Sequence, residues 1–366
     1  MMRGGAVPVE AETRTATEIA PSILTSTRWL ATVSALAVAS VATVLVCLHF
    51  GAERIGLAEV VAILWRAVQE GRLAAESAGS SAVIVLEVRV PRLVLGFLVG
   101  GCLAAVGVTL QAMLRNPLAD PYVLGVSGGA AVGASLAIVT GLSAAGAVWL
   151  PVSAFAGSLL SLALLYRIAA VYGHLSVHTL LLAGVIINAL FSALIMFLTS
   201  LMDPTHAFRV LSWMLGSLAA PDDLSLSVVA SFLAIGGLLL ARQARALNLL
   251  TVGEDSARSL GVDVERVKRT LLVTTALLTG AVVSVSGLIG FVGMAVPHAA
   301  RMLCGADNRL LLPACAFSGG MFLVIADTVA RTALAPAELP VGVMTALVGA
   351  PFFLYLLVVR KGGRAL

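Results

Sequence analysis

Ten long apolar runs constrain the fold of this 366-residue chain more than any other feature. A helix needs about 20 apolar residues to cross the hydrocarbon core of a membrane. With 60% hydrophobic and 11% charged residues, the chain is far more apolar than a soluble domain, whose charged share is about 25%. The runs begin near Trp29, Leu93, Val123, Val148, Leu180, Leu224, Leu271, Leu288, Leu310 and Val341.

The composition of these runs indicates helices. They are rich in Leu, Ala, Val and Gly over helical lengths, whereas a membrane β-barrel would alternate apolar and polar residues in short strands. We therefore predict an all-α polytopic membrane protein with about ten transmembrane helices.

The segment 115–129 is a polar break between two of the runs. Proline, present at 117 and 121, lacks a backbone N–H and restricts the residue before it, so it cannot continue a helix. The helix that begins near Leu93 must therefore end here, and the chain must turn round in the membrane.

Small residues recur at four-residue spacing on both sides of this turn, at 96, 100 and 104 and again at 125, 129 and 133. This spacing places them on one face of a helix and lets another helix approach closely. Two adjacent runs with such faces predict a tightly packed helical bundle.

The same turn resembles a known signature. Asn116-Pro117-Leu118-Ala119, followed by Pro121 and by the Leu-Gly-Val-Ser sequence of 124–127, is similar to the motif of the permease subunits of type II ABC importers. These permeases carry ferric siderophores, haem and vitamin B12. Further blocks similar to this family follow at 89–92, 182–185, 213–218, 247–261, 290–298 and 338–351.

The resemblance implies the assembly and its cargo. It predicts one permease domain over 29–360 that works as a homodimer in the bacterial inner (plasma) membrane. Its partners would be two ATPase subunits inside and a periplasmic or lipid-anchored substrate-binding protein outside. A ferric siderophore is the commonest cargo of the family, and haem and cobalamin come next.

The chain carries no nucleotide-binding loop of its own. Such a loop needs a lysine directly after a glycine, and the lysines here are Lys268, after valine, and Lys361, after arginine. We therefore predict a permease and not an enzyme, with no cofactor or metal bound by this chain. ATP and Mg²⁺ would be used by the partner ATPase.

An ion-coupled secondary transporter is the alternative from another functional class. Ion coupling normally requires an ionisable residue facing a cavity near the middle of the membrane. Asp327 is the best candidate, but an ion pair with Arg331 on the next turn of a helix is a simpler explanation.

Basic residues fall mostly on one side of the predicted membrane. If the N-terminus is inside, 16 of the 23 Lys and Arg residues are cytoplasmic and seven are outside, as the positive-inside rule requires. The net charge of +4 is therefore a topology signal and does not indicate nucleic acid. Both termini are predicted to be cytoplasmic, with disordered residues 1–28 and a short tail over 361–366.

The charged stretch between the sixth and seventh runs is the strongest docking candidate. Gly253 and Gly261 bracket a segment in which Glu254 and Arg258 can pair on one face of a short helix. The apolar side chains that could contact a partner are Leu249, Leu250 and Leu260. The resemblance implies that residues 246–266 hold the coupling helices that dock on the ATPase; the alternative is a basic loop lying on anionic lipid.

The resemblance also implies a cytoplasmic gate. Asn116 and Leu118 correspond to its first constriction. Val177 and His178 correspond to a second one, where the family often has small hydroxyl residues, so this chain departs from the pattern.

Three arginines are expected on the outer face. By resemblance, Arg89, Arg92 and Arg331 receive carboxylates of the binding protein, since cations steer an acidic partner. The alternative is that they anchor the helices at the membrane interface.

A short outer helix is expected over 207–218. His206 and Arg209 lie at its start, where Arg209 could meet an anionic group of the cargo. The alternative is that it anchors the helix at the membrane edge.

Overall fold

The computed structural model describes residues 24–51, 53–70, 79–171, 174–219 and 222–362, with side chains as far as Tyr355. The first part of the chain forms α1 (Ser26–His49), α2 (Leu57–Glu70), α4 (Ser80–Val83), the π-helix η1 (Ile84–Arg89), α5 (Val90–Met113), the 3-10 turn η2 (Pro121–Leu124), α6 (Val126–Val139), the 3-10 turn η3 (Leu142–Ala144) and α7 (Trp149–Ala169).

A small antiparallel hairpin, β1 (Ala170–Val171) and β2 (His174–Leu175), follows α7. The rest of the chain forms α8 (Val177–Ser200), α9 (Pro204–Met214), α10 (Asp223–Arg242), α11 (Ala244–Val252), α12 (Glu254–Ser259), α13 (Val264–Ser286), α14 (Val292–Cys304), α15 (Asn308–Thr332) and α16 (Val341–Gly362). The predicted all-α membrane fold is confirmed in this coarser sense.

Seven helices within the described residues are long and apolar enough to cross a membrane. The runs near Val123 and Leu288 form shorter helices, α6 with 14 residues and α14 with 13. The reason is local: Pro121 opens a 3-10 turn before α6, and Phe291 has a φ of 66° directly before α14. The expectation of ten full-length spans is thus not established.

Only small parts of the two predicted tails, residues 24–28 and 361–362, lie within the described residues. α1 already begins at Ser26, inside the predicted tail 1–28, and residues 1–23 lie outside the described residues. At the other end α16 runs to Gly362, and 363–366 lie outside the described residues.

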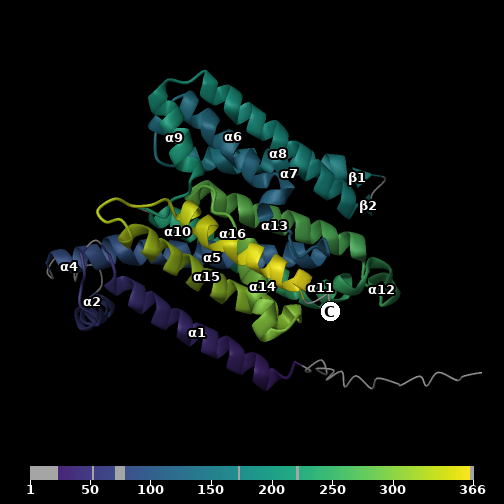
Figure 1. Ribbon diagram of the computed structural model, residues 1–366, viewed down its shortest axis with the longest axis horizontal. Helices are drawn as coiled ribbons and strands as arrows, with labels where there is room; N and C mark the ends of the chain where they lie inside the picture. Colours follow the sequence, from purple (N-terminus) through teal and green to yellow (C-terminus); the bar gives the residue numbers. More distant parts are fainter. Residues whose placement is uncertain (1–23, 52, 71–78, 172–173, 220–221, 363–366) are drawn as a thin grey trace, which may run out of the picture.

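The helices form a bundle around α5, as Figure 1 shows. α1 runs along one side of the bundle, and α6, α7 and α8 form a layer on the opposite side. α11, α12 and the β1–β2 hairpin lie at one end of the long helices, whereas α2, α4 and α9 lie at the other. The predicted topology puts the first end inside the cell and the second outside, and on that basis they are called the inner end and the outer end. The candidate functional residues therefore separate into two groups, one at each end.

Close backbone contact fixes the position of α5. A Cβ atom added at Gly100 would lie 2.7 Å from Cβ of Leu323 on α15, and one at Gly101 would lie 2.8 Å from the carbonyl oxygen of Ala316. Helices in lipid associate through such packing of small residues. The predicted small-residue face of this helix thus meets α15.

The second predicted face meets α7, with one correction. Gly129 and Gly133 pack against Gly157 and Ser153 of α7. Gly125 does not belong to this face, because it precedes the helix with a φ of 78°, a left-handed conformation that glycine adopts without steric cost.

The arginines predicted just before the second span lie inside a longer helix. Helix runs without interruption from Ser80 to Met113, so Arg89 and Arg92 project from its outer part. The π-helical turn η1 ends at Arg89, two residues before Pro91. Proline has no N–H to donate into the helix, and π-helical turns occur mostly as single-turn irregularities inside α-helices.

The contact between α5 and α15 can be tested with Gly100→Val. The added side chain meets backbone atoms of α15, so the free energy of unfolding is expected to fall by about 1–3 kcal/mol. Unfolding in mixed detergent micelles measures this change. Gly237→Val on α10 is the control, because a Cβ there meets nothing within 4 Å, and equal losses in the two variants would contradict the packing argument.

Candidate functional site

The predicted gate turn is built by local hydrogen bonds. Asn116 Oδ1 accepts a hydrogen bond from the backbone N–H of Leu118 at 2.9 Å, which makes an Asx turn. Asn116 is half-buried, whereas Leu118 is 47% exposed. The structure gives Asn116 a role in forming the turn, and the gating role of both residues stays a prediction.

Tyr122, just after the second proline, ties this turn to the rest of the bundle. Asn188 on α8 donates its side-chain N–H to the carbonyl oxygen of Tyr122 at 2.8 Å. The backbone N–H of Ile289 donates to the Tyr122 hydroxyl at 2.5 Å. Neither contact was predicted from the sequence, because nothing in the local pattern around the tyrosine indicates these distant partners.

The second predicted gate lies at the start of α8. Ser176 caps this helix, and its hydroxyl accepts a hydrogen bond from the backbone N–H of Thr179 at 3.3 Å. Val177 is half-buried and packs against the main core, while His178 is exposed. Both residues come directly after the β1–β2 hairpin, so the position of the hairpin sets theirs.

The predicted coupling segment forms the two short helices α11 and α12. Gly253 joins the two helices with a φ of 154°. Gly261, two residues after the end of α12, has a φ of 85°. Glu254 and Arg258 pair across one turn of α12 at 3.4 Å, which confirms the predicted ion pair.

The predicted apolar contacts of this segment differ in exposure. Leu250 is 1% exposed and belongs to the core, and Leu249 is half-buried against it. Leu260 is 67% exposed, and Val252, which the sequence analysis did not select, is 74% exposed. The apolar surface available to a partner is therefore formed by Val252 and Leu260, because the helical spacing turns Leu250 inward.

Polar contacts fasten α11 to the N-terminus of α15. Asn248 donates to Asp307 Oδ1 at 2.8 Å and accepts from the backbone N–H of Asn308 at 2.8 Å. Arg309 donates to Asp307 Oδ2 at 2.6 Å. The pKa of Asp307 is lowered to about 2, mainly by this bond to Arg309, so the carboxylate remains charged at neutral pH.

At the opposite end of the bundle, Arg92 joins α5 to α15 and to the segment before α16. Its guanidinium donates to Asp327 at 2.9 Å and to Glu338 at 2.9 Å. Arg331 lies 3.8 Å from the same Asp327 carboxylate, as the predicted pair requires. The nearer partner of Asp327 is nevertheless Arg92, which local sequence spacing could not reveal.

Arg89 and Arg331 bind the outer end of α1. Arg89 donates to the carbonyl oxygens of Leu48 at 2.6 Å and of Glu53, and Arg331 donates to that of Cys47 at 3.1 Å. The last carbonyl groups of a helix lack partners within the helix, and a cation there also interacts favourably with the helix dipole. The two arginines thus cap α1.

All three of these arginines are largely buried. Arg89, Arg92 and Arg331 are 3%, 8% and 7% exposed, and each has partners within the chain. Their predicted role in receiving the carboxylates of a binding protein stays a prediction, and the structure assigns them an internal role in addition.

The short outer helix α9 is present, slightly earlier than predicted. Asp203 caps it by accepting from the backbone N–H of Thr205 at 2.9 Å, and the ring of His206 contacts the same carboxylate. Arg209 is exposed and donates to the hydroxyl of Ser143 at 3.2 Å. Arg209 therefore remains accessible, whereas His206 is occupied at the cap; contact of either with cargo stays a prediction.

A cavity of about 270 Å³ lies beside α9. Its wall contains Ser212 and Ser217 together with Arg92, Asp327 and Glu338. The buried pair of Arg92 and Asp327 and the exposed Glu338 thus border a hollow next to the predicted outer helix.

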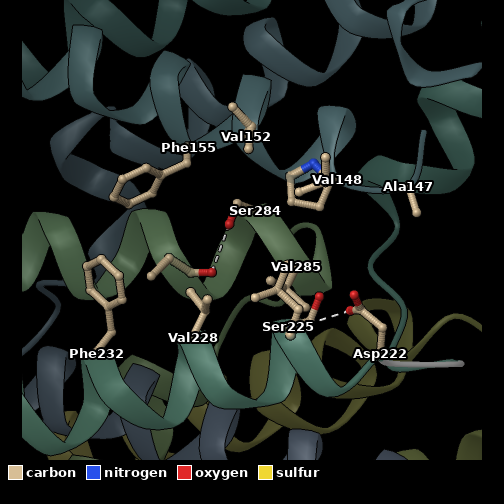
Figure 2. A pocket seen from close by; sticks show the side chains of 13 residues that line it. Ala147, Val148, Val152, Phe155, Asp222, Ser225, Val228, Phe232, Ser284 and Val285 are labelled. Atoms are coloured by element: carbon tan, nitrogen blue, oxygen red, sulfur yellow. Dashed lines mark hydrogen bonds between the residues drawn. The ribbon is translucent and has the colours of Figure 1, made fainter. Parts of the chain in front are cut away.

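A second cavity, of about 200 Å³, lies between α7, α10 and α13. Figure 2 shows Phe155 and Val152 facing Phe232 and Val228 across it, with the hydroxyl of Ser284 in its wall. Its lining is mostly apolar and contains none of the predicted gate, coupling or docking residues.

No group of three or more His, Cys, Asp or Glu side chains able to hold a metal ion occurs within the described residues. The absence of a bound metal or cofactor stays a prediction.

Comparisons with known proteins agree on one family. The model of the FecCD transport family matches residues 35–359. The cobalamin import system permease protein BtuC of Halobacterium salinarum is 46% identical over 276 residues, which are 75% of this chain and 73% of the relative. The hemin transport system permease protein HmuU of Yersinia pestis is 43% identical, over 77% of this chain and 85% of the relative.

A solved structure shares the fold. An inward-facing conformation of a metal-chelate type ABC transporter matches with a TM-score of 0.76 and 30% identity, covering 90% of this chain and 99% of the other. The likeness thus spans nearly the whole chain.

The buried carboxylate at the outer end can be tested with Asp327→Asn. Arg92 and Arg331 would lose the buried charge between them, so the free energy of unfolding is expected to fall by about 3–5 kcal/mol. Glu338→Gln is the matched control, since that side chain is 50% exposed and such a pair contributes about 1 kcal/mol or less. Unfolding in detergent micelles measures both, and a larger loss for Glu338→Gln would refute the assignment.

Proposed function

The chain belongs to the FecCD transport family, and from this we propose that it is the permease subunit of an ATP-driven importer that carries a metal chelate to the cytoplasm. The family is that of type II ABC importers for iron chelates, haem or vitamin B12, in which a separate subunit hydrolyses ATP. The full-length likeness to a metal-chelate type ABC transporter is the observation that carries the proposal.

The cargo we propose is a large metal chelate of the tetrapyrrole type, haem or cobalamin. The family base rate alone favours a ferric siderophore. The permeases named for cobalamin and hemin are 46% and 43% identical to this chain, whereas a probable iron chelatin permease of Helicobacter pylori is 36% identical. This difference moves the tetrapyrroles ahead of the siderophores as candidates.

The working unit that we propose contains two copies of this chain, two ATPase subunits and one binding protein, in the inner membrane with both termini in the cytoplasm. The exposed apolar face of α8, with Leu182, Ile186 and Leu190 each more than half exposed, offers a surface for the second copy. α11 and α12 would dock on the ATPase, and Arg89, Arg92 and Arg331 would lie near the binding protein.

Transport would proceed by alternating access. Binding-protein docking and closure of the ATPase subunits would move α11 and α12, and this movement would open and shut the path at Asn116 and Leu118. An ion-coupled mechanism has less support, because Asp327 forms ion pairs with Arg92 and Arg331. These two cations already compensate the negative charge that a coupling ion would need.

Uptake of haemin, cobalamin and a ferric hydroxamate, each labelled, tests the function. In cells that lack this chain, we expect uptake of one tetrapyrrole to be lost and to return when the chain is restored. Loss and rescue of the hydroxamate alone would refute the cargo assignment but support the importer. Unchanged uptake of all three would refute the import of these chelates.

ATPase docking is tested with Leu260→Glu. A carboxylate on this exposed apolar residue opposes burial against a partner, so the amount of co-purified ATPase subunit is expected to fall about tenfold or more, the effect of losing a contact that contributes at least about 1.4 kcal/mol. Leu334→Glu is the control, since Leu334 is 59% exposed and lies beyond the far end of α15. Undiminished co-purification of Leu260→Glu would show that Leu260 lies outside the interface.

A further inference from the structure

Lys268, in the first turns of α13, is a buried cation. Its side chain is 3% exposed, and its Nζ lies 3.1 Å from Glu254 and 3.1 Å from Glu265. A charge removed from water is destabilising unless ion pairs and hydrogen bonds compensate. The two carboxylates supply that compensation, and they come from different helices, Glu254 from α12 and Glu265 from α13.

The same ammonium group also reaches the β1–β2 hairpin. Lys268 Nζ donates to the carbonyl oxygen of Leu175 at 2.5 Å, and the backbone N–H of Leu175 donates to Glu265 Oε2 at 2.8 Å. Both backbone groups of Leu175 are therefore held by one Lys–Glu pair. The Leu175 side chain is 3% exposed and packs in the core. The residue is therefore held by its N–H group, its carbonyl group and its side chain.

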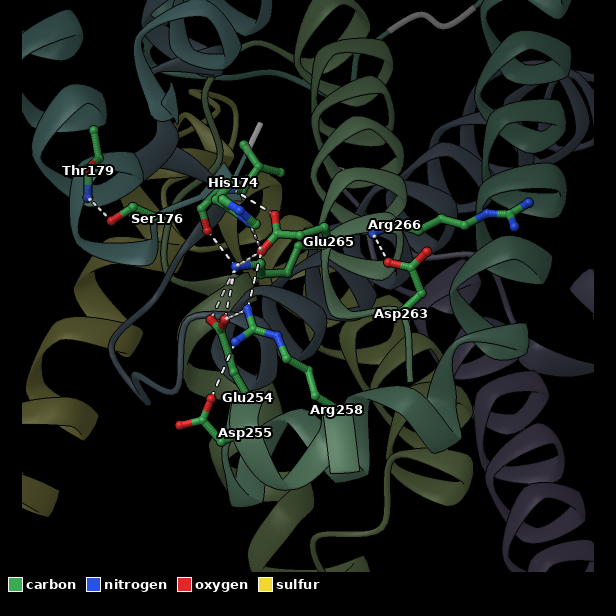
Figure 3. A network of polar contacts seen from close by, with 11 residues as sticks. His174, Ser176, Thr179, Glu254, Asp255, Arg258, Asp263, Glu265 and Arg266 are labelled. Carbon is green, nitrogen blue, oxygen red and sulfur yellow. Dashed lines mark hydrogen bonds and ion pairs between the residues drawn. The ribbon is translucent and has the colours of Figure 1, made fainter. Parts of the chain in front are cut away.

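One ammonium group thus joins three separate parts of the chain. A lysine has three N–H donors. Here Nζ donates to Glu254 of α12 and to Leu175 of the hairpin before α8, and it forms an ion pair with Glu265 of α13. Figure 3 shows these contacts converging, with Arg258 and His174 also facing Glu265. Arg258 and His174 each lie 3.6 Å from Glu265, so two further basic side chains lie next to this cluster. The cluster of Lys268, Glu254, Glu265 and the backbone of Leu175 is called the Lys268 joint below.

We propose that Lys268 is a positioning residue that transmits movement of α12 to the start of α8. The inference rests on the proposed function, since it needs α12 to move with the ATPase. Val177 and His178, the predicted second gate, come just after Leu175 and Ser176, so a displacement of Leu175 must move them. Lys268 binds α12 through Glu254, and Lys268 and Glu265 together bind the hairpin through the backbone of Leu175.

This geometry distinguishes the two gates. The turn at Asn116 has its own Asx hydrogen bond and is tied to α8 and to the chain before α14 through Tyr122. The start of α8 is instead held to the coupling segment through the Lys268 joint. Movement of α12 can therefore reach Val177 and His178 through the contacts of Lys268 with Glu254 and Leu175, without passing through the turn at Asn116.

The test uses the complete importer, with its ATPase and binding protein, in proteoliposomes. Lys268→Met keeps the length of the side chain and removes the charge and donors. We expect the ATPase to remain bound, with its hydrolysis rate within about twofold, and cargo uptake per ATP to fall about tenfold, which is within the range of coupling free energies between sites. Arg269→Met is the matched control, because Arg269 is exposed on the same helix, and it should leave uptake per ATP unchanged.

Spin labels at Ser259→Cys and His178→Cys separate coupling from stability. In the Lys268→Met protein, the ATP-dependent change at position 259 should persist and that at 178 should be lost. Persistence of both changes, or unchanged uptake per ATP, would overturn the inference. Loss of both together with loss of bound ATPase would assign Lys268 to docking and would also overturn it.

A second variant covers the case in which Lys268→Met does not fold. Glu254→Gln alters the joint from its partly exposed side, where the glutamate is 23% exposed, and the same loss of uptake per ATP is expected. If the wild-type assembly itself shows no ATP-dependent uptake, the proposed function and this inference fall together. Normal coupling in both variants overturns the inference alone.

Discussion

The contact between backbones along α5 is the interaction on which the rest of the structure depends. In lipid, helices gain little by hiding apolar side chains, so close packing must hold them together. Gly100 and Gly101 bring α5 against α15, and Gly107 brings it against Gly293 at the start of α14. Once these helices are in contact, the loops at both ends have little freedom, and the polar residues there are brought within bonding distance.

Within the described residues, Arg92 and Lys268 are buried charges near opposite ends of the bundle, and each connects parts that are distant in sequence. At the outer end Arg92 holds Asp327, 235 residues away. At the inner end Lys268 holds Leu175, 93 residues away. Charges at such sites require partners because water cannot reach them freely. The partners also specify which helix ends meet. The apolar side chains in the middle of the helices specify this less well, because they resemble one another from helix to helix.

Features that depend on neighbouring residues could largely be predicted from the sequence. The proline turn after α5, the glycine faces except for Gly125, and the ion pair of Glu254 with Arg258 are of this kind, and they are present. The short helix expected over 207–218 is also present, as α9 over Pro204–Met214. The long-range contacts of Arg92, Tyr122 and Lys268 could not be predicted, since no local pattern names a partner so far away. The inward orientation of Leu250 was also missed, because the sequence does not reveal which face of a short amphipathic helix meets the core.

α1 differs from the other long helices in how it is attached. Only 11% of its most apolar 18-residue stretch is buried. Arg89 and Arg331 cap the carbonyl groups at its outer end. Near its inner end, the indole N–H of Trp29 donates to the carbonyl oxygen of Arg309 at 3.0 Å. Arg331 follows Cys47 by 284 residues. During biosynthesis, α1 is therefore made long before α15, which supplies the Arg331 cap, and until then the carbonyl group of Cys47 has to be hydrated at the lipid–water boundary.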